Sequence, residues 1–187
     1  MLVLTLSLLH IFIITLSNAL ISIPLELLGF KITWAAFTYP LIVVITDLTV
    51  RKLGKDVAST VIYKAFPFAV FTSILIVFLE KNNLSFAVRI GCASAVSYGI
   101  GTLIDVHIFQ RVRNRCNIWW VAPCLSTVIA NIIDTYSFFI VAFSNSVDPY
   151  MNAHWIEIST TLIIAKIIIG IFCFLPLYGL VLKKLNV

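Results

Sequence analysis

Charged residues are scarce in this chain. Only 11% of its 187 residues are Asp, Glu, Lys or Arg, whereas soluble domains average about 25%. Hydrophobic residues make up 61% of the sequence, and the mean hydropathy is +1.08. This composition is typical of a membrane protein and leaves no room for a second, soluble domain. We therefore expect residues 1–187 to form a single integral membrane domain.

The signatures of common enzymes and metal sites are also missing. The sequence has no HExxH, GxSxG or P-loop motif. His10, His107 and His154 lack metal-ligand spacing. The four cysteines form no CxxC pair, and three of them lie in apolar segments, so a disulfide framework is not expected. We therefore predict a protein that is not an enzyme and that holds no metal or cofactor.

Long hydrophobic runs dominate what is present. They cover approximately residues 2–23, 33–53, 57–79, 84–108, 118–143 and 155–182. Each is near or above the roughly 20 residues that an α-helix needs to cross a bilayer. The first run has no Lys or Arg ahead of it and is long, so we expect a retained helix rather than a cleaved signal peptide. The predicted fold class is all-α, a polytopic membrane protein with six transmembrane helices.

The basic residues indicate an orientation. Lysine and arginine gather in the second and fourth connections and in the C-terminal tail, while the odd connections hold only two lysines. The positive-inside rule then places both termini and the even connections in the cytoplasm. This topology also explains the net charge of +5 without nucleic-acid binding. The residues in the basic group are Arg51, Lys52, Lys55, Arg111, Arg113, Arg115, Lys183 and Lys184.

Several polar residues fall in the outer half of the predicted spans. At a rise of about 1.5 Å per residue, Asp134 and Lys166 both lie roughly 14 Å below the outer ends of their helices. Their equal depth and opposite charge predict that the two side chains neutralise each other when the site is empty. Asn131 shares a helix face with Asp134 at spacing i, i+3. A charge in hydrocarbon is costly and usually marks a pathway or binding site. We interpret Asn131 and Asp134 as a substrate site, with interhelical hydrogen bonding as the alternative. Three further candidates near the outer ends are Asn18, Arg89 and Glu157.

A second polar layer lies at the predicted inner side. Asp47 and Arg51 are spaced i, i+4 and can pair on one helix face. Asp105 and Arg111 lie at the inner end of the fourth predicted helix. These residues fit an inner gate or ion pair. The alternative for Asp47 and Arg51 is a structural pair that fixes helix packing, and the alternative for Asp105 and Arg111 is that they simply end a helix and hold the inner loop.

The polar residues lie within strings that resemble a known family, the queuosine-precursor transporters, also described as vitamin-uptake transporters. The resemblance covers nearly the whole chain, in order, and is weakest in the third helix. The strings are SNALISIP from Ser17, TWAAFTYP from Thr33, TDLTVRKLG at 46–54, IDVHIFQRVR at 104–113, WWVAPCLSTVIANIIDT at 119–135, HWIEI at 154–158 and FLPLYG at 174–179.

The resemblance implies import of 7-deazaguanine bases for queuosine in tRNA, across the bacterial inner membrane. The implied substrates are 7-cyano-7-deazaguanine, 7-aminomethyl-7-deazaguanine and queuine. It also implies a fold similar to the substrate-binding S-components of energy-coupling-factor vitamin importers. An S-component that needs ATPase partners is therefore the alternative function, although the first helix has no Ala-x-x-x-Ala docking motif. The preferred base, the energy source and the oligomeric state stay open.

The candidate residues suit such a ligand. A deazaguanine presents a ring N–H and an exocyclic amine on one edge, and the Asp134 carboxylate can accept from both. Asn131 is placed to bind the adjacent carbonyl or amine. Trp34 and Phe37 are candidates to stack on the flat ring, although Trp34 also suits an interface anchor. Arg89, Glu157 and Lys166 are candidates to orient Asp134 or to gate the outer mouth.

Overall fold

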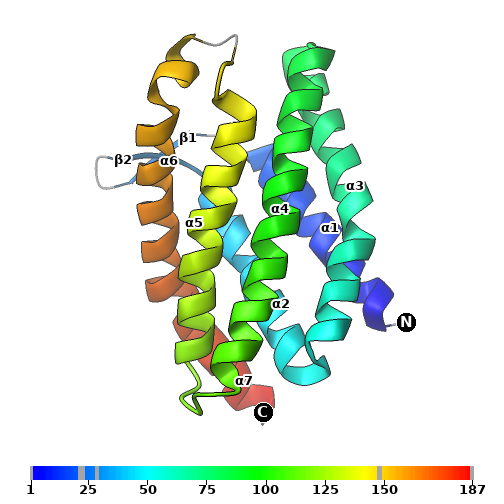
Figure 1. Cartoon of the computed structure of the whole chain (residues 1–187), viewed down its shortest axis with the longest axis vertical. Helices are drawn as coiled ribbons and strands as arrows, with labels where there is room; N and C mark the ends of the chain where they lie inside the picture. The colour runs from blue at the N-terminus through cyan, green and yellow to red at the C-terminus, as the bar shows by residue number, and fades with distance from the viewer. Residues whose placement is uncertain (1, 21–23, 28–29, 147–148, 186–187) are drawn as a thin grey trace.

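The protein is a bundle of long helices with one short hairpin (Figure 1). The computed structural model describes residues 2–20, 24–27, 30–146 and 149–185. The helices in chain order are α1 (Leu2–Leu20), α2 (Ala35–Leu53), α3 (Lys55–Lys81), α4 (Leu84–Arg113), α5 (Val121–Phe143), α6 (Pro149–Ile169), the π-helix η1 (Gly170–Phe174) and α7 (Leu175–Leu185).

The predicted all-α architecture is confirmed. The last three elements form one continuous helical stretch, so the helices correspond to the six hydrophobic runs. Four of them are long and apolar enough to cross a membrane by themselves: Lys55–Glu80, Leu84–Arg113, Val121–Phe143 and Pro149–Lys183. At 19 residues each, α1 and α2 are about 28 Å long, close to the thickness of the hydrocarbon core.

A two-stranded hairpin between α1 and α2 was not predicted. Its strands are β1 (Pro24–Leu27) and β2 (Phe30–Thr33), and they pair in antiparallel fashion. The pairing satisfies backbone groups that would otherwise lie unbonded between two membrane helices. Apolar and polar residues alternate in β2, and the register sets Glu26 opposite Lys31, a pairing of opposite charges that favours this alignment.

Helix α4 lies at the centre of the bundle, between α3 and α5 (Figure 1). Small residues on α4 allow this approach. At Gly91, a methyl group would overlap the side chain of Ile74 on α3. Close packing of this kind replaces the hydrophobic driving force that is missing between helices in lipid.

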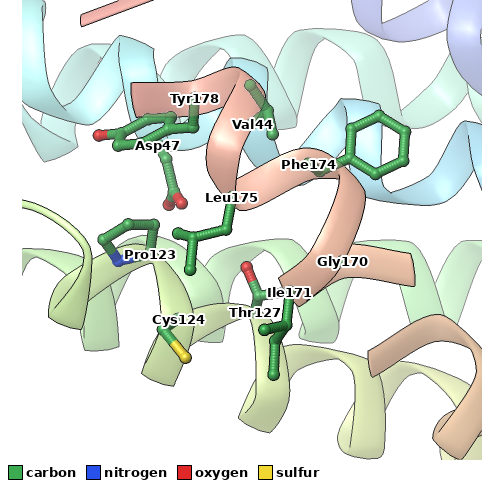
Figure 2. Close-up of a pocket in the computed structure, with 10 residues that line it drawn as sticks. All are labelled: Val44, Asp47, Pro123, Cys124, Thr127, Gly170, Ile171, Phe174, Leu175 and Tyr178. Atoms are coloured by element: carbon green, nitrogen blue, oxygen red, sulfur yellow. The ribbon is translucent and has the colours of Figure 1, made fainter. Parts of the chain in front are cut away.

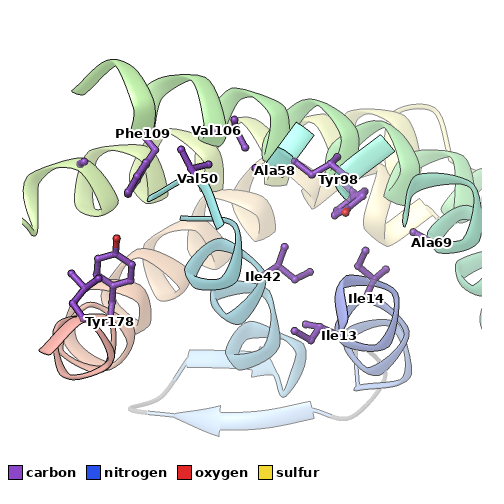
Figure 3. Close-up of a cluster of buried hydrophobic side chains, with 13 residues drawn as sticks. Ile13, Ile14, Ile42, Val50, Ala58, Ala69, Tyr98, Val106, Phe109 and Tyr178 are labelled. Carbon is purple, nitrogen blue, oxygen red and sulfur yellow. The ribbon is translucent and has the colours of Figure 1, made fainter. Parts of the chain in front are cut away.

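The main apolar core brings the N-terminal and C-terminal helices together. Figure 3 shows Ile14 of α1, Ile42 of α2, Phe109 of α4 and Tyr178 of α7 around it. All four side chains are buried. Through this core, side chains of α2, α4 and α7 pack against one another.

The C-terminal helical stretch contains a local irregularity. Its middle turn, η1, is a π-helix that ends just before Pro176 in α7. Proline lacks an N–H, and its ring would clash with the carbonyl group four residues earlier, so the helix widens ahead of it. Gly170 at the start of η1 lies against α5, where a Cβ atom would be 3.3 Å from Thr127 Cγ2.

The bundle has one end rich in basic residues. The α2–α3 connection, the α4–α5 connection and the C-terminus lie together there (Figure 1). We call this the basic end, and define it by Arg51, Lys52, Lys55, Arg111, Arg113, Arg115 and Lys183. The α3–α4 connection and the start of α6 lie at the opposite end. The structure therefore collects the predicted basic connections on one side.

Candidate functional site

The strongest candidate site lies on the buried face of α5. Asn131 is fully buried and Asp134 is 4% exposed. Lys166 of α6 reaches across to α5, because its Nζ lies 3.3 Å from Asp134 Oδ2 and 3.1 Å from Thr135 Oγ1. The pairing of Asp134 with Lys166, predicted from equal depth and opposite charge, is confirmed. We refer to Asn131, Asp134 and Lys166 as the α5–α6 site.

Within the described part of the chain, the amide of Asn131 has no hydrogen-bond partner for either its nitrogen or its oxygen. A buried polar group left unpaired costs about 1–3 kcal/mol, and such groups in native proteins call for an explanation. A bound polar ligand would supply both missing hydrogen bonds. The site therefore offers one carboxylate acceptor, one ammonium donor and an amide that can donate and accept.

The aromatic candidates on α2 divide by position. Phe37 packs against Ile169 together with Ala165, on the stretch of α6 that carries Lys166. Trp34 precedes α2, is 46% exposed, and lies with its ring centroid 5.9 Å from that of Phe37. Phe37 thus packs on α6, the helix that carries Lys166. Trp34 is the more exposed of the two aromatic side chains and lies next to Phe37.

Arg89 has a structural environment that the sequence did not predict. Its guanidinium donates to the carbonyl oxygens of Val141 at 3.1 Å, Asn145 at 3.2 Å, and Ser144. These carbonyls belong to the C-terminal end of α5, which lacks intrahelical partners and carries the negative end of the helix dipole. Arg89 therefore fastens α4 to the end of α5.

The other two outer candidates are not brought into the α5–α6 site by the described contacts. The Glu157 side chain is 80% exposed and lies 3.6 Å from His154 on the same helix. Asn18 has a side chain that lies outside the described part of the structure. The predicted outer layer thus reduces to Asn131, Asp134 and Lys166.

The inner layer differs from the predicted ion pair. Among the described residues the ion pairs are Asp134–Lys166 and His154–Glu157, so Asp47 and Arg51 do not form one. Asp47 instead lies against Asp105 of α4, and the Ser126 hydroxyl of α5 is beside both carboxyl groups. The predicted pair of Asp47 with Arg51 within α2 is therefore wrong, and Asp47 contacts a residue of another helix instead.

The two arginines of that layer have other surroundings. The Arg51 guanidinium interacts with Tyr178 of α7, and the backbone carbonyl of Arg51 accepts from Arg113 Nη1 at 2.9 Å. Arg111 is exposed at the end of α4. Ser126 and Tyr178 were missed as site residues. The only sequence signal for them was their place inside the two strings WWVAPCLSTVIANIIDT and FLPLYG.

A small cavity of about 20 Å³ lies beside Asp47, large enough for about one water molecule. Figure 2 shows the Asp47 carboxyl group pointing into the space between Pro123 and Leu175, with η1 forming one wall. A groove of about 1080 Å³ follows at the basic end, lined in part by Trp119, Trp120 and Lys183. Ile171 and Leu175 line both the cavity and the groove.

Long apolar helices that enclose a carboxylate, an ammonium group and an amide are typical of multi-pass membrane proteins, in which buried polar groups usually mark a pathway or binding site. Residues 33–181 match the family model described as "Putative vitamin uptake transporter". The chain belongs to this family of transporters.

Two relatives support the same assignment. The chain is 40% identical over 192 residues to the "Queuosine precursor transporter" of Escherichia coli strain K12, covering 96% of this chain and 86% of the relative. It is 35% identical over 201 residues to the "Probable queuosine precursor transporter" of Haemophilus influenzae, covering 95% and 85%. Both relatives are named as transporters and not as enzymes.

No solved structure matches the chain at a significant level. The expected likeness to the S-components of energy-coupling-factor importers therefore stays a prediction.

Proposed function

We propose that this protein imports queuosine precursors and binds them at the α5–α6 site. The proposed substrates are 7-cyano-7-deazaguanine, 7-aminomethyl-7-deazaguanine and queuine, for use in tRNA modification. The names of the two relatives support the substrate class. The observation that carries the choice of site is the fully buried Asn131, whose amide has no hydrogen-bond partner among the described residues and lies on the same helix as the buried Asp134.

The chemistry of the site fits the base. The Asp134 carboxylate accepts from the ring N–H and the exocyclic amine on one edge of the deazaguanine, and charge-assisted hydrogen bonds of this kind are strong. Asn131 binds the adjacent carbonyl or amine. Lys166 neutralises Asp134 while the site is empty, which removes the cost of an isolated charge in the bundle. Phe37 supplies an aromatic face, with Trp34 behind it.

The described structure corresponds to a closed site. Asn131 has no exposed surface and Asp134 almost none, so a planar base cannot enter until the surrounding helices separate. Closure around a bound ligand would strengthen each polar contact, because water is excluded and the local dielectric constant falls.

We also propose that the basic end faces the cytoplasm of a bacterial cell, with both termini there and the chain in the inner membrane. The clustering of the basic connections at one end supports this orientation. After replacement of the native cysteines, Ser85→Cys and Asn117→Cys place one exposed thiol near each end. A membrane-impermeant reagent added to intact cells is expected to label Ser85→Cys and to leave Asn117→Cys unlabelled. Labelling of Asn117→Cys alone would reverse the orientation.

Reconstitution of the purified chain alone tests the function. Liposomes that contain only this protein are expected to take up labelled 7-cyano-7-deazaguanine, whereas protein-free liposomes do not. Any gradient across the liposome membrane then sets the final internal concentration of the base. Uptake that appears only after ATPase subunits and ATP are added would establish the S-component alternative. A chain that neither transports these bases nor is stabilised by them against thermal unfolding is not a transporter of this class.

A further inference from the structure

The contact between Asp47 and Asp105 has no role in the function proposed above. Both residues are 1% exposed, and they come from different helices, α2 and α4. The only buried carboxylate that forms an ion pair among the described residues is Asp134. Within the same residues, one oxygen of Asp47 and both oxygens of Asp105 are buried without a hydrogen-bond partner.

Two buried carboxyl groups in contact cannot both be ionised at low cost. Burial disfavours each charged form, and the like charges repel each other, so such pairs retain a proton that the two groups share. In bulk water both groups would be ionised at neutral pH. The pair therefore has two forms, one with a shared proton and one with two charges, and the surroundings decide between them.

The other titratable groups near the pair lie on its basic-end side. Arg51 of α2 and Arg113 of α4 interact with Tyr178 of α7, and Tyr178 in turn faces Asp47. Cys124 of α5 lines the same cavity as Asp47. On α1, His10 is 3.1 Å from the Tyr98 hydroxyl and is held there. The α1 and α3 residues in the adjoining core are apolar, namely Ile13, Ile14, Ala58, Ile62 and Ala69.

A route for a proton reaches the pair. The cavity beside Asp47 has room for about one water molecule, and Tyr178 is among the residues that line it. A water there would have the Asp47 carboxyl group as a polar partner. The cavity shares Ile171 and Leu175 with the groove at the basic end. Ile171 and Leu175 therefore form part of the wall between the cavity and the groove.

The same structural elements also line the α5–α6 site. Ser126, beside the carboxyl pair, precedes Asn131 and Asp134 on α5 by about 7 and 12 Å of helix. On the neighbouring stretch, Lys166 lies four residues before Gly170, which borders the cavity. A shift of the α6–η1 stretch against α5 therefore changes the surroundings of both sites together.

We propose that the Asp47–Asp105 pair holds one exchangeable proton, and that occupancy of the pair by this proton is linked to occupancy of the α5–α6 site by substrate. The proton is taken from, or released to, water in the cavity, and the pair changes between its singly charged and doubly charged forms. Linkage is reciprocal, so protonation changes substrate affinity by the same factor by which substrate changes proton affinity. The linkage rests on the proposed function, whereas the shared proton does not.

Calorimetric titration of the purified full-length chain with 7-cyano-7-deazaguanine tests the linkage. In wild type, the binding heat is expected to differ between two buffers of different ionisation enthalpy, and affinity is expected to change by up to about tenfold per pH unit. The variants Asp105→Asn and Asp47→Asn should each bind the base with a heat that does not depend on the buffer. Their affinity should not depend on pH. Asp56→Asn, a change at an exposed carboxylate of α3, should behave as wild type.

Infrared spectroscopy without substrate tests the proton itself. The carbonyl stretch of a protonated carboxylic acid is expected in wild type near neutral pH, to persist in Asp56→Asn, and to be lost in Asp47→Asn combined with Asp105→Asn. Its absence from wild type overturns the proposal, as does a proton linkage that survives in both single variants. Replacement of the pH effect by a sodium effect also overturns it, in favour of a metal cation. If no binding heat is seen at all, the proposed substrate is wrong, and the infrared band alone decides whether the pair holds a proton.

Discussion

Substitution of Asp134 by Asn is expected to abolish uptake of queuosine precursors at low external concentration, while the protein still inserts in the membrane. The variant keeps the shape of the side chain but loses the charge that would accept two hydrogen bonds from the base. A hydrogen bond to a charged group contributes about 1.5–3 kcal/mol, equivalent to roughly a ten- to hundredfold loss of affinity. Asn131→Ala is expected to have a similar effect, because it removes the amide that pairs with the adjacent group.

Uptake should be measured with labelled 7-cyano-7-deazaguanine, over a range of concentrations, in cells that lack both synthesis and import of the base. Asp56→Asn is the matched control, since it makes the same chemical change at an exposed position. Membrane levels of each variant report insertion. Near-normal uptake by Asp134→Asn at low substrate concentration would remove Asp134 from the binding site.

Loss of Lys166 is expected to destabilise the empty protein. The Lys166 and Asp134 side chains are only 15% and 6% exposed, and Lys166→Met leaves the Asp134 carboxylate buried without its cation. Breaking a buried pair by removing one partner costs about 3–5 kcal/mol in soluble proteins. Lys166→Met should therefore lower the unfolding temperature of the purified protein. The double variant Asp134→Asn with Lys166→Met should recover part of that stability but not transport.

A double-mutant cycle on the unfolding free energies measures the interaction directly. Lys64→Met on α3 is a suitable control, because Lys64 is exposed on the surface of the bundle. Destabilisation of the double variant equal to the sum of the two single effects would show that Asp134 and Lys166 do not interact. Lys166 would then act independently, as a gate.

The sequence predicted the helices. It also predicted the ion pair between Asp134 and Lys166, because depth in the membrane was enough to place these two residues side by side. The rise of a helix is fixed, so Asp134 and Lys166 could be set at the same level from the ends of their spans. Depth was sufficient in this case because the two helices follow each other in the chain and run side by side.

Rotation about the helix axes could not be predicted in the same way. A membrane helix is apolar on all sides, so hydrophobic periodicity gives little information about which face meets a neighbour. For this reason the spacing predicts a pair of Asp47 with Arg51 on one helix, although the neighbour of Asp47 in the structure is Asp105 on α4. Arg89 is predicted to orient Asp134 or to gate the outer mouth for a similar reason, because backbone carbonyls at a helix end carry no sequence signal.

The three hydrogen bonds from Arg89 to the end of α5 restrict how the transporter can open. Sliding α5 lengthwise along α4 would break all of them at once, at about 1.5–3 kcal/mol for each bond to a charged group. These bonds therefore hold α4 and α5 together as one wall of the site. Opening is then expected to move the α6–η1–α7 stretch, which carries Lys166 and the widened π-helical turn.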